Sequence, residues 1–144
     1  MDLFKGKTVI ITGGGRAVLS DGSCGSIGYG IATAFAKEGA NIVVTGRNKQ
    51  KLDDAKEELE RLYGVKVLPV AADVSAGADN EAAVSAVVEK TIAQFGRIDV
   101  LVNNAQASAS GVPLAENTVE QFDLALYSGL YATFFYNESL LSAP

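Results

Sequence analysis

The sequence predicts an α/β fold in which a parallel sheet is covered by helices on both faces. Three observations lead to this prediction: short β-branched runs alternate with helical segments four times, glycine follows each of the first three helical segments, and a glycine-rich stretch comes directly after the first run. Nearly continuous apolar runs are typical of strands buried on both faces of a parallel sheet. Their alternation with helices indicates a doubly wound sheet.

Four strands are expected, and each is a short run rich in valine and isoleucine. They lie at residues 8–12 (TVIIT), 41–45 (NIVVT), 65–70 (VKVLPV) and 98–102 (IDVLV). Pro69 cannot donate a hydrogen bond to a neighbouring strand. The third strand is therefore predicted at the edge of the sheet.

The helical segments between the strands are amphipathic. Residues 48–63 and 80–95 repeat apolar side chains at spacings of three and four, which places them on one face; these are Leu52, Ala55, Leu59 and Leu62, then Val84, Val87, Val88, Thr91 and Phe95. A last helix is expected from Thr118, because Gln121 stands three residues later, at the spacing of a capping box. This helix has a broad apolar face between Phe122 and Phe134. Glycines can end helices in the left-handed conformation, and Gly39, Gly64 and Gly96 stand where this is needed.

Composition excludes several kinds of site and partner. The net charge is −5 and basic residues are not clustered, which disfavours nucleic-acid binding. The absence of histidine excludes a histidine-ligated zinc site and a Ser-His-Asp triad within these residues, and no metal site is expected. The single cysteine, Cys24, cannot form an internal disulfide. Neither a signal peptide nor a membrane span is recognisable. These observations predict a cytoplasmic protein with no membrane partner.

The stretch from Ile11 to Ala32 carries the main functional signal. It begins with Thr12 and three glycines directly after the first strand, and it ends with Ser26, Ile27 and Gly28, where a helix is expected to start. A glycine-rich turn lets backbone N–H groups approach a pyrophosphate, and the helix N-terminus adds partial positive charge. The alternative is a tight turn with close helix packing and no ligand.

With these motifs the chain resembles the N-terminal part of a short-chain dehydrogenase/reductase, over residues 3–135. The family signature, Thr-Gly-x-x-x-Gly-x-Gly, is matched in two halves, with Ser26 in place of the middle glycine. The resemblance implies a Rossmann-like fold and one cofactor-binding loop, interrupted by an insertion from Ala17 to Gly25. The residues that it assigns to this loop are Gly13, Gly15, Arg16, Ser26, Ile27 and Gly28.

Two further motifs follow the third and fourth strands. The resemblance places Asp73 and Val74 against the adenine ring of a dinucleotide. Asn103, Asn104 and Ala105 match the family's Asn-Asn-Ala-Gly, with Gln106 in place of the glycine, and this implies cofactor positioning by Asn104, Ala105 and Gln106. Capping of strand ends by the two asparagines is the alternative.

The residue after the second strand bears on the choice of cofactor. NAD sites normally carry a carboxylate there, whereas this sequence has Gly46, Arg47 and Asn48, with no acidic residue before Asp53. A guanidinium can bind a phosphate in bidentate fashion, so Arg47 favours NADP, with NAD possible as cofactor. The resemblance suggests Arg16 as a second cationic contact, and a solvated Arg47 is the alternative.

The resemblance implies an oxidoreductase that interconverts a carbonyl and an alcohol by hydride transfer. The family's catalytic tyrosine is followed four residues later by lysine, and no tyrosine here has that spacing. Residues 1–144 are therefore expected to form a nucleotide-binding part truncated after about four βα units, with no catalytic residue and no activity on its own. Gly129, or Ser128 after a one-residue shift, stands at the position of the family's catalytic asparagine.

Several alternatives remain open at this level. The form of the loop at Ser26 and Ile27 is similar to that of enoyl-thioester reductases. A complete short product that binds NADP(H) without turnover is a second alternative. In either case the apolar last helix predicts self-association, and the resemblance implies a homo-oligomer in which this helix belongs to the subunit interface.

Overall fold

The computed structural model describes residues 2–23, 25–74 and 79–142. These residues form a parallel sheet in the order β3-β2-β1-β4. The strands are β1 (Thr8–Thr12), β2 (Asn41–Gly46), β3 (Val67–Ala71) and β4 (Val100–Val102). The predicted α/β class is confirmed, and so is the edge position of the strand that contains Pro69.

β3 and β4 each begin two residues later than predicted. The Glu60 carboxylate accepts a hydrogen bond of 3.0 Å from the N–H of Val67 at the start of β3. The Asp99 carboxylate, just before β4, accepts a hydrogen bond of 2.8 Å from the N–H of Thr8, the first residue of β1. An acidic side chain thus binds a backbone amide near the start of each of these two strands.

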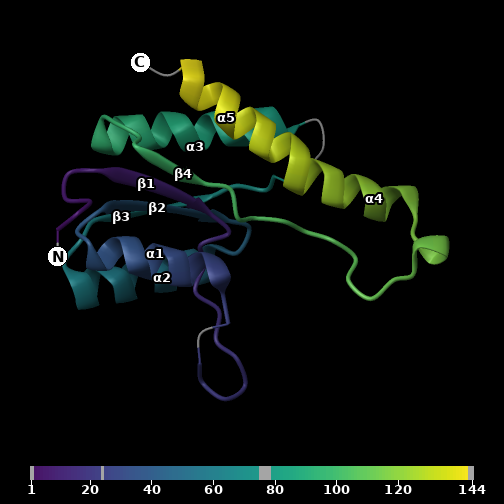
Figure 1. Cartoon of the computed structure of the whole chain (residues 1–144), viewed down its shortest axis with the longest axis horizontal. Coiled ribbons are helices and arrows are strands. Elements are labelled where there is room, and N and C mark those ends of the chain that lie inside the picture. The colour runs from purple at the N-terminus through teal and green to yellow at the C-terminus, as the bar shows by residue number, and fades with distance from the viewer. Residues whose placement is uncertain (1, 24, 75–78, 143–144) are drawn as a thin grey trace.

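Helices cover both faces of the sheet (Figure 1). On one face lie α1 (Ile27–Lys37) and α2 (Lys49–Tyr63), and on the other lie α3 (Asn80–Phe95) and α5 (Ala132–Ser142). Alternate residues of β1 point to the two faces, so Ile11 belongs to the core under α1 and α2, and Ile10 to the core under α3 and α5. The sheet is thus buried on both sides, as its apolar runs predict.

The predicted helix ends are confirmed. The helix predicted over residues 48–63 begins one residue later, because Asn48 caps α2: its side chain accepts a hydrogen bond of 3.1 Å from the N–H of Lys51. Thr118 and Gln121 form both hydrogen bonds of a capping box. The glycines that follow the first three helices have the positive φ of the left-handed region: 86° at Gly39, 67° at Gly64 and 75° at Gly96.

One residue of the predicted face of α2 is not buried. Leu52, Ala55 and Leu59 are at most 1% exposed, whereas Leu62 is 52% exposed. At 3.6 residues per turn Leu62 lies roughly 80° around the helix axis from Leu52, at the margin of the packed stripe. Tyr63 packs against the core instead.

The last helical segment is interrupted, where one helix was predicted. It consists of α4 (Val119–Ala125), the π-helical segment η3 (Leu126–Tyr131) and α5, after a short 3₁₀ turn, η2 (Leu114–Glu116). Its buried residues include Ala132 and Tyr136, which pack in the core beneath α3 and α5. The apolar face predicted from the sequence is exposed to solvent; Phe122, Leu130 and Phe134 are 60–63% exposed.

The order of the strands determines where loops diverge. From β1 the chain moves outward to β2 and β3, then returns to place β4 on the other side of β1. The loops that leave the carboxyl ends of β1 and β4 therefore separate, and such a point is where ligands bind in open α/β sheets. Among the described residues no helix is long and apolar enough to cross a membrane.

Candidate functional site: a cavity at the carboxyl ends of the strands

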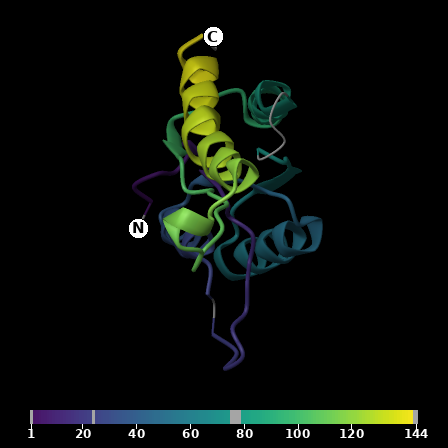
Figure 2. The same ribbon diagram turned by 90° about the vertical axis from the view of Figure 1, so that its right-hand side faces the viewer.

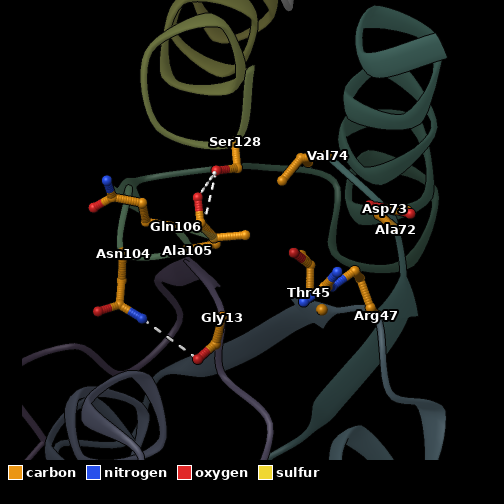
Figure 3. A pocket seen from close by; sticks show the side chains of 12 residues that line it. Gly13, Thr45, Arg47, Ala72, Asp73, Val74, Asn104, Ala105, Gln106 and Ser128 are labelled. Carbon is orange, nitrogen blue, oxygen red and sulfur yellow. Dashed lines mark hydrogen bonds between the residues drawn. The ribbon is translucent and has the colours of Figure 1, made fainter. Parts of the chain in front are cut away.

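A cavity of about 260 Å³ lies at this point of divergence. All four strand ends contribute to its wall, and the π-helical segment closes one side (Figure 3). The lining residues are Gly13, Thr45, Gly46, Arg47, Ala72, Asp73, Val74, Asn104, Ala105, Gln106, Ala107 and Ser128. The structure thus brings together seven of the predicted site residues: Gly13, Arg47, Asp73, Val74, Asn104, Ala105 and Gln106.

Thr12 joins the loops that follow β1 and β4. Its hydroxyl oxygen accepts hydrogen bonds of 2.8 Å from the N–H groups of both Asn104 and Ala105. The amide nitrogen of Asn104 donates in return to the carbonyl oxygens of Thr12, at 3.0 Å, and Gly13, at 3.4 Å (Figure 3). The side chain of Asn104 therefore caps a strand end, which is the alternative that the sequence left open, while its neighbours Ala105 and Gln106 face the cavity.

The two halves of the glycine stretch meet at Gly13 and Gly28. Gly13 has a φ of 69°, and its N–H donates to the carbonyl oxygen of Thr45. A β-carbon on Gly28 would lie 2.1 Å from the Gly13 carbonyl oxygen and 2.7 Å from the amide nitrogen of Asn104. Gly28 thus lets the first turn of α1 approach the end of β1, and the stretch forms one loop.

The extra residues leave this loop and return to the same point. The N–H of Gly25 donates a hydrogen bond of 3.0 Å to the carbonyl oxygen of Ala17. Residues 18–23 project away from the body of the molecule beyond that contact (Figures 1 and 2). Cys24 lies outside the described residues.

A second, more open groove of about 600 Å³ adjoins the cavity on the side of α2. Gly13 and Arg47 border both spaces, and Gly15 and Ser26 line the groove. Ser26 also caps α1, where its hydroxyl accepts a hydrogen bond of 3.2 Å from the N–H of Tyr29. The other lining residues are Ala17, Gly46, Asn48, Lys51 and Leu52. Lys51 was missed by the sequence analysis, although it stands in the first turn of the helix that follows Arg47.

Arg16, Ile27 and Gly28 are predicted site residues that do not line either space. Ile27 is 75% exposed at the start of α1 and Gly28 is buried behind Gly13. The Arg16 guanidinium Nε lies 3.0 Å from a carboxylate oxygen of Glu58. The other carboxylate oxygen of Glu58 accepts a hydrogen bond from the Tyr29 hydroxyl.

This cluster of Arg16, Tyr29 and Glu58 joins the glycine loop to α1 and α2. The hydrogen bond from Tyr29 lowers the pKa of Glu58 below 4.5, and Arg16 contributes in the same direction. Burial raises the pKa of Tyr29, with a further contribution from Glu58. The ionised carboxylate is thus the favoured form at neutral pH.

Ser128 is the residue of the π-helical segment that faces the cavity (Figure 3). It is 2% exposed, and its hydroxyl oxygen accepts a hydrogen bond of 2.8 Å from the N–H of Ala107. The carbonyl oxygens of Ala107 and Leu124, at 3.0 Å and 2.7 Å from the Ser128 hydroxyl oxygen, are within reach of its O–H donor. Gly129 faces the side chain of Gln106 instead. Of the two residues that the resemblance offers for the catalytic asparagine, the structure therefore places Ser128 at the site.

Asn80 is a second residue that the sequence analysis missed. It is fully buried, and its amide nitrogen donates hydrogen bonds to the carbonyl oxygens of Val74, at 2.5 Å, and Tyr127, at 2.9 Å. It thereby connects the loop after β3 to the π-helical segment. Within the described ranges no group of three or more acidic, cysteine or histidine side chains could hold a metal ion.

Comparison with known proteins agrees with this geometry. The family described as enoyl-(acyl carrier protein) reductase matches residues 22–142. A short chain dehydrogenase/reductase of Macrophomina phaseolina is 31% identical over 136 residues, which are 94% of this chain and 70% of that protein. The chain belongs to the short-chain dehydrogenase/reductase family.

Two other members of the short-chain dehydrogenase/reductase family are closely similar to this chain. A 12alpha-hydroxysteroid dehydrogenase of a Clostridium species is 65% identical over 136 residues, which are 94% of this chain and 50% of that protein. The crystal structure of L-sorbose reductase from Gluconobacter frateurii, complexed with NADPH and L-sorbose, superposes with a TM-score of 0.82 at 34% identity, over 98% of this chain and 49% of that one. The chain thus spans about half the length of these two relatives.

The contact between Gly28 and Gly13 leads to a prediction about stability. Gly28→Ala is expected to lower the free energy of unfolding by about 2 kcal/mol, because the added methyl group forces the first turn of α1 away from Gly13. Gly30→Ala in the same helix is the control, since a β-carbon there meets nothing within 4 Å; alanine should stabilise the helix by up to about 1 kcal/mol. Urea unfolding of both variants measures the difference, and equal effects would contradict the assignment of Gly28.

The lowered pKa of Glu58 leads to a prediction about acid stability. A carboxylate whose pKa is lower in the folded state stabilises the fold above the unfolded value of 4.5, and this contribution is lost as the pH falls through the folded value. Glu58→Gln should therefore flatten the loss of stability below about pH 4.5. The control is Glu57→Gln, at an exposed neighbour, which should retain the wild-type slope in urea unfolding at a series of acidic pH values.

Proposed function

We propose that residues 1–144 are the nucleotide-binding part of an NADP-dependent oxidoreductase that interconverts a carbonyl and an alcohol. The observation that carries the proposal is the loop after β1: no β-carbon fits at Gly28, and the groove beside it is bordered by Arg47. The similarity to a 12alpha-hydroxysteroid dehydrogenase and to a sugar reductase complexed with NADPH supports the same chemistry.

The residues around the cavity and the groove would each hold a different part of a dinucleotide. Helix N-termini favour phosphates, so the N-terminus of α1, where Ser26 lines the groove, would hold the pyrophosphate. Asp73 and Val74 would border the adenine ring, and Ala105, Gln106 and Ser128 would border the nicotinamide end. When bound, the nicotinamide supplies or accepts the hydride.

The charges after β2 support NADP rather than NAD. Arg47 borders both the cavity and the groove. Asp53, the first carboxylate after β2, forms an ion pair of 3.0 Å with Lys49. A 2′-phosphate at Arg47 would therefore meet a guanidinium and no opposing carboxylate from the start of α2.

A titration tests this proposal. NADPH should bind more tightly than NADH, as measured by reduced-nicotinamide fluorescence or calorimetry, with folding checked by circular dichroism. Arg47→Gln should weaken NADPH binding roughly tenfold and leave NADH binding unchanged, because a charge-assisted pair to the 2′-phosphate is lost. Arg61→Gln, near the far end of α2, is the control and should change neither affinity. Equal affinities for both cofactors in the wild-type chain would refute the NADP preference.

The proposed reaction needs residues beyond those in this chain. The resemblance assigns proton transfer to a tyrosine with lysine four residues later, and none of the five tyrosines here has that spacing. Residues 1–144 alone should therefore neither reduce ketones with NADPH nor oxidise 12α-hydroxysteroids with NADP. Turnover above background would contradict the proposal that a catalytic part is separate from this domain.

An enoyl-thioester reductase is the second candidate. It is favoured by the description of the family that matches residues 22–142 and by the form of the loop at Ser26 and Ile27. Reduction of crotonyl-thioesters by a full-length protein, without oxidation of secondary alcohols, would favour it.

A non-catalytic NADP(H)-binding module is a third candidate. It requires a discrete 144-residue product, which an intact mass from native material would reveal.

A homo-oligomer is part of the proposed function. Phe122, Leu130 and Phe134 form an apolar face on α4, η3 and α5 that is more than half exposed, and such faces mark association sites. Sedimentation velocity at increasing concentration should show self-association, and Phe134→Ser should weaken it. A monomer at all concentrations would contradict this part of the proposal.

A further inference from the structure

We propose that Lys51, rather than Arg16, is the second cation that recognises the 2′-phosphate of NADP(H), and that Glu58 and Tyr29 hold Arg16 away from it. The inference rests on the proposed function, which supplies the cofactor. It assigns a specificity residue from geometry and reverses the assignment that the loop sequence suggests.

Arg16 is held on the side of α2 by Glu58, which is itself bonded to Tyr29. Its Nε lies 3.0 Å from Glu58, whose other carboxylate oxygen is occupied by the hydroxyl of Tyr29. The Tyr29 side chain is 5% exposed in the core, and only 28% of the Arg16 side chain is exposed. Turning Arg16 toward a phosphate would leave the partly buried carboxylate of Glu58 without its cation, which is costly.

Lys51 stands at the groove that Arg16 does not line. It lies in the first turn of α2, four residues after Arg47, and both residues border this groove. Two backbone contacts fix its position: its N–H donates to the Asn48 side chain at 3.1 Å, and its carbonyl oxygen accepts a hydrogen bond of 2.9 Å from the N–H of Arg16.

The glycine loop lies directly on Lys51. A β-carbon on Gly15 would be 3.0 Å from the β-carbon of Lys51. The absence of a side chain at Gly15 therefore lets the loop pass over the base of the lysine while its long side chain remains at the groove. Among the described residues neither Arg47 nor Lys51 has an ion-pair partner.

The nearby carboxylates of α2 are occupied by other groups. Asp53 pairs with Lys49 at 3.0 Å, and Asp54 accepts a hydrogen bond of 2.8 Å from Gln50. A phosphate monoester carries nearly two negative charges at neutral pH. Arg47 and Lys51 supply two positive charges, and the N-terminus of α2 adds its partial charge.

The test compares charge-removing substitutions in the whole chain. Lys51→Gln should weaken NADPH binding roughly tenfold, as expected for loss of a charge-assisted contact, and leave NADH binding within about twofold. Lys90→Gln removes the same charge from α3, at an exposed residue that does not line the groove, and should change NADPH binding less than about twofold. Arg16→Gln should affect NADPH and NADH equally.

A second measurement isolates the 2′-phosphate. Adenosine 2′,5′-bisphosphate and adenosine 5′-phosphate are titrated by calorimetry, and Lys51→Gln should weaken only the first. Selective loss of NADPH and bisphosphate binding in Arg16→Gln, with Lys51→Gln unaffected, would overturn the inference and leave the proposed function intact. If the folded wild-type chain bound none of these ligands, both the inference and the proposed function would fail.

Discussion

The close approach of α1 to the end of β1 is the constraint on which the rest of the site depends. The carbonyl oxygen of Gly13 occupies the space that a β-carbon of Gly28 would need. The amide of Asn104 reaches the same carbonyl group, and the N–H of Gly13 is bonded to Thr45. Segments from β1, β2, β4 and α1 therefore meet around one residue, Gly13, beside the cavity.

The two arginines near this point, Arg16 and Arg47, make different contacts. The guanidinium of Arg16 forms an ion pair with Glu58 and thereby fixes the glycine loop on α2. Arg47 borders the space where a ligand would lie. Proximity in the sequence to the glycine motif thus does not place a cation at the cavity or the groove, because Glu58 on α2 pairs with the nearer arginine.

Local patterns were sufficient to predict most of the fold. The β-branched runs, the capping box at Thr118 and the left-handed glycines depend on neighbouring residues, and the structure has all of them. Features that depend on distant partners could not be predicted in this way. Glu58 lies 42 residues from Arg16 along the chain, and nothing near either residue indicates that they pair.

The π-helical segment explains why the position of Ser128 was ambiguous. A π-helical turn contains about one more residue than an α-helical turn, so the face that each residue presents shifts within η3. A comparison of short motifs could therefore place either Ser128 or Gly129 at the cavity. Only the bonds from the Ser128 hydroxyl to the backbone of Ala107 distinguish them.

The insertion after β1 leaves and rejoins the body at Ala17 and Gly25, which are bonded to each other. The loop beyond that bond is closed on itself, so its length is decoupled from the geometry of Gly13 and Gly28. Lengthening such a loop costs little free energy, since loop-closure entropy grows only with the logarithm of length. Residues 18–23 can thus vary in number and composition without disturbing the glycine turn. The same segment offers a place for a fluorophore or an affinity tag beyond Ala17, which lines the groove.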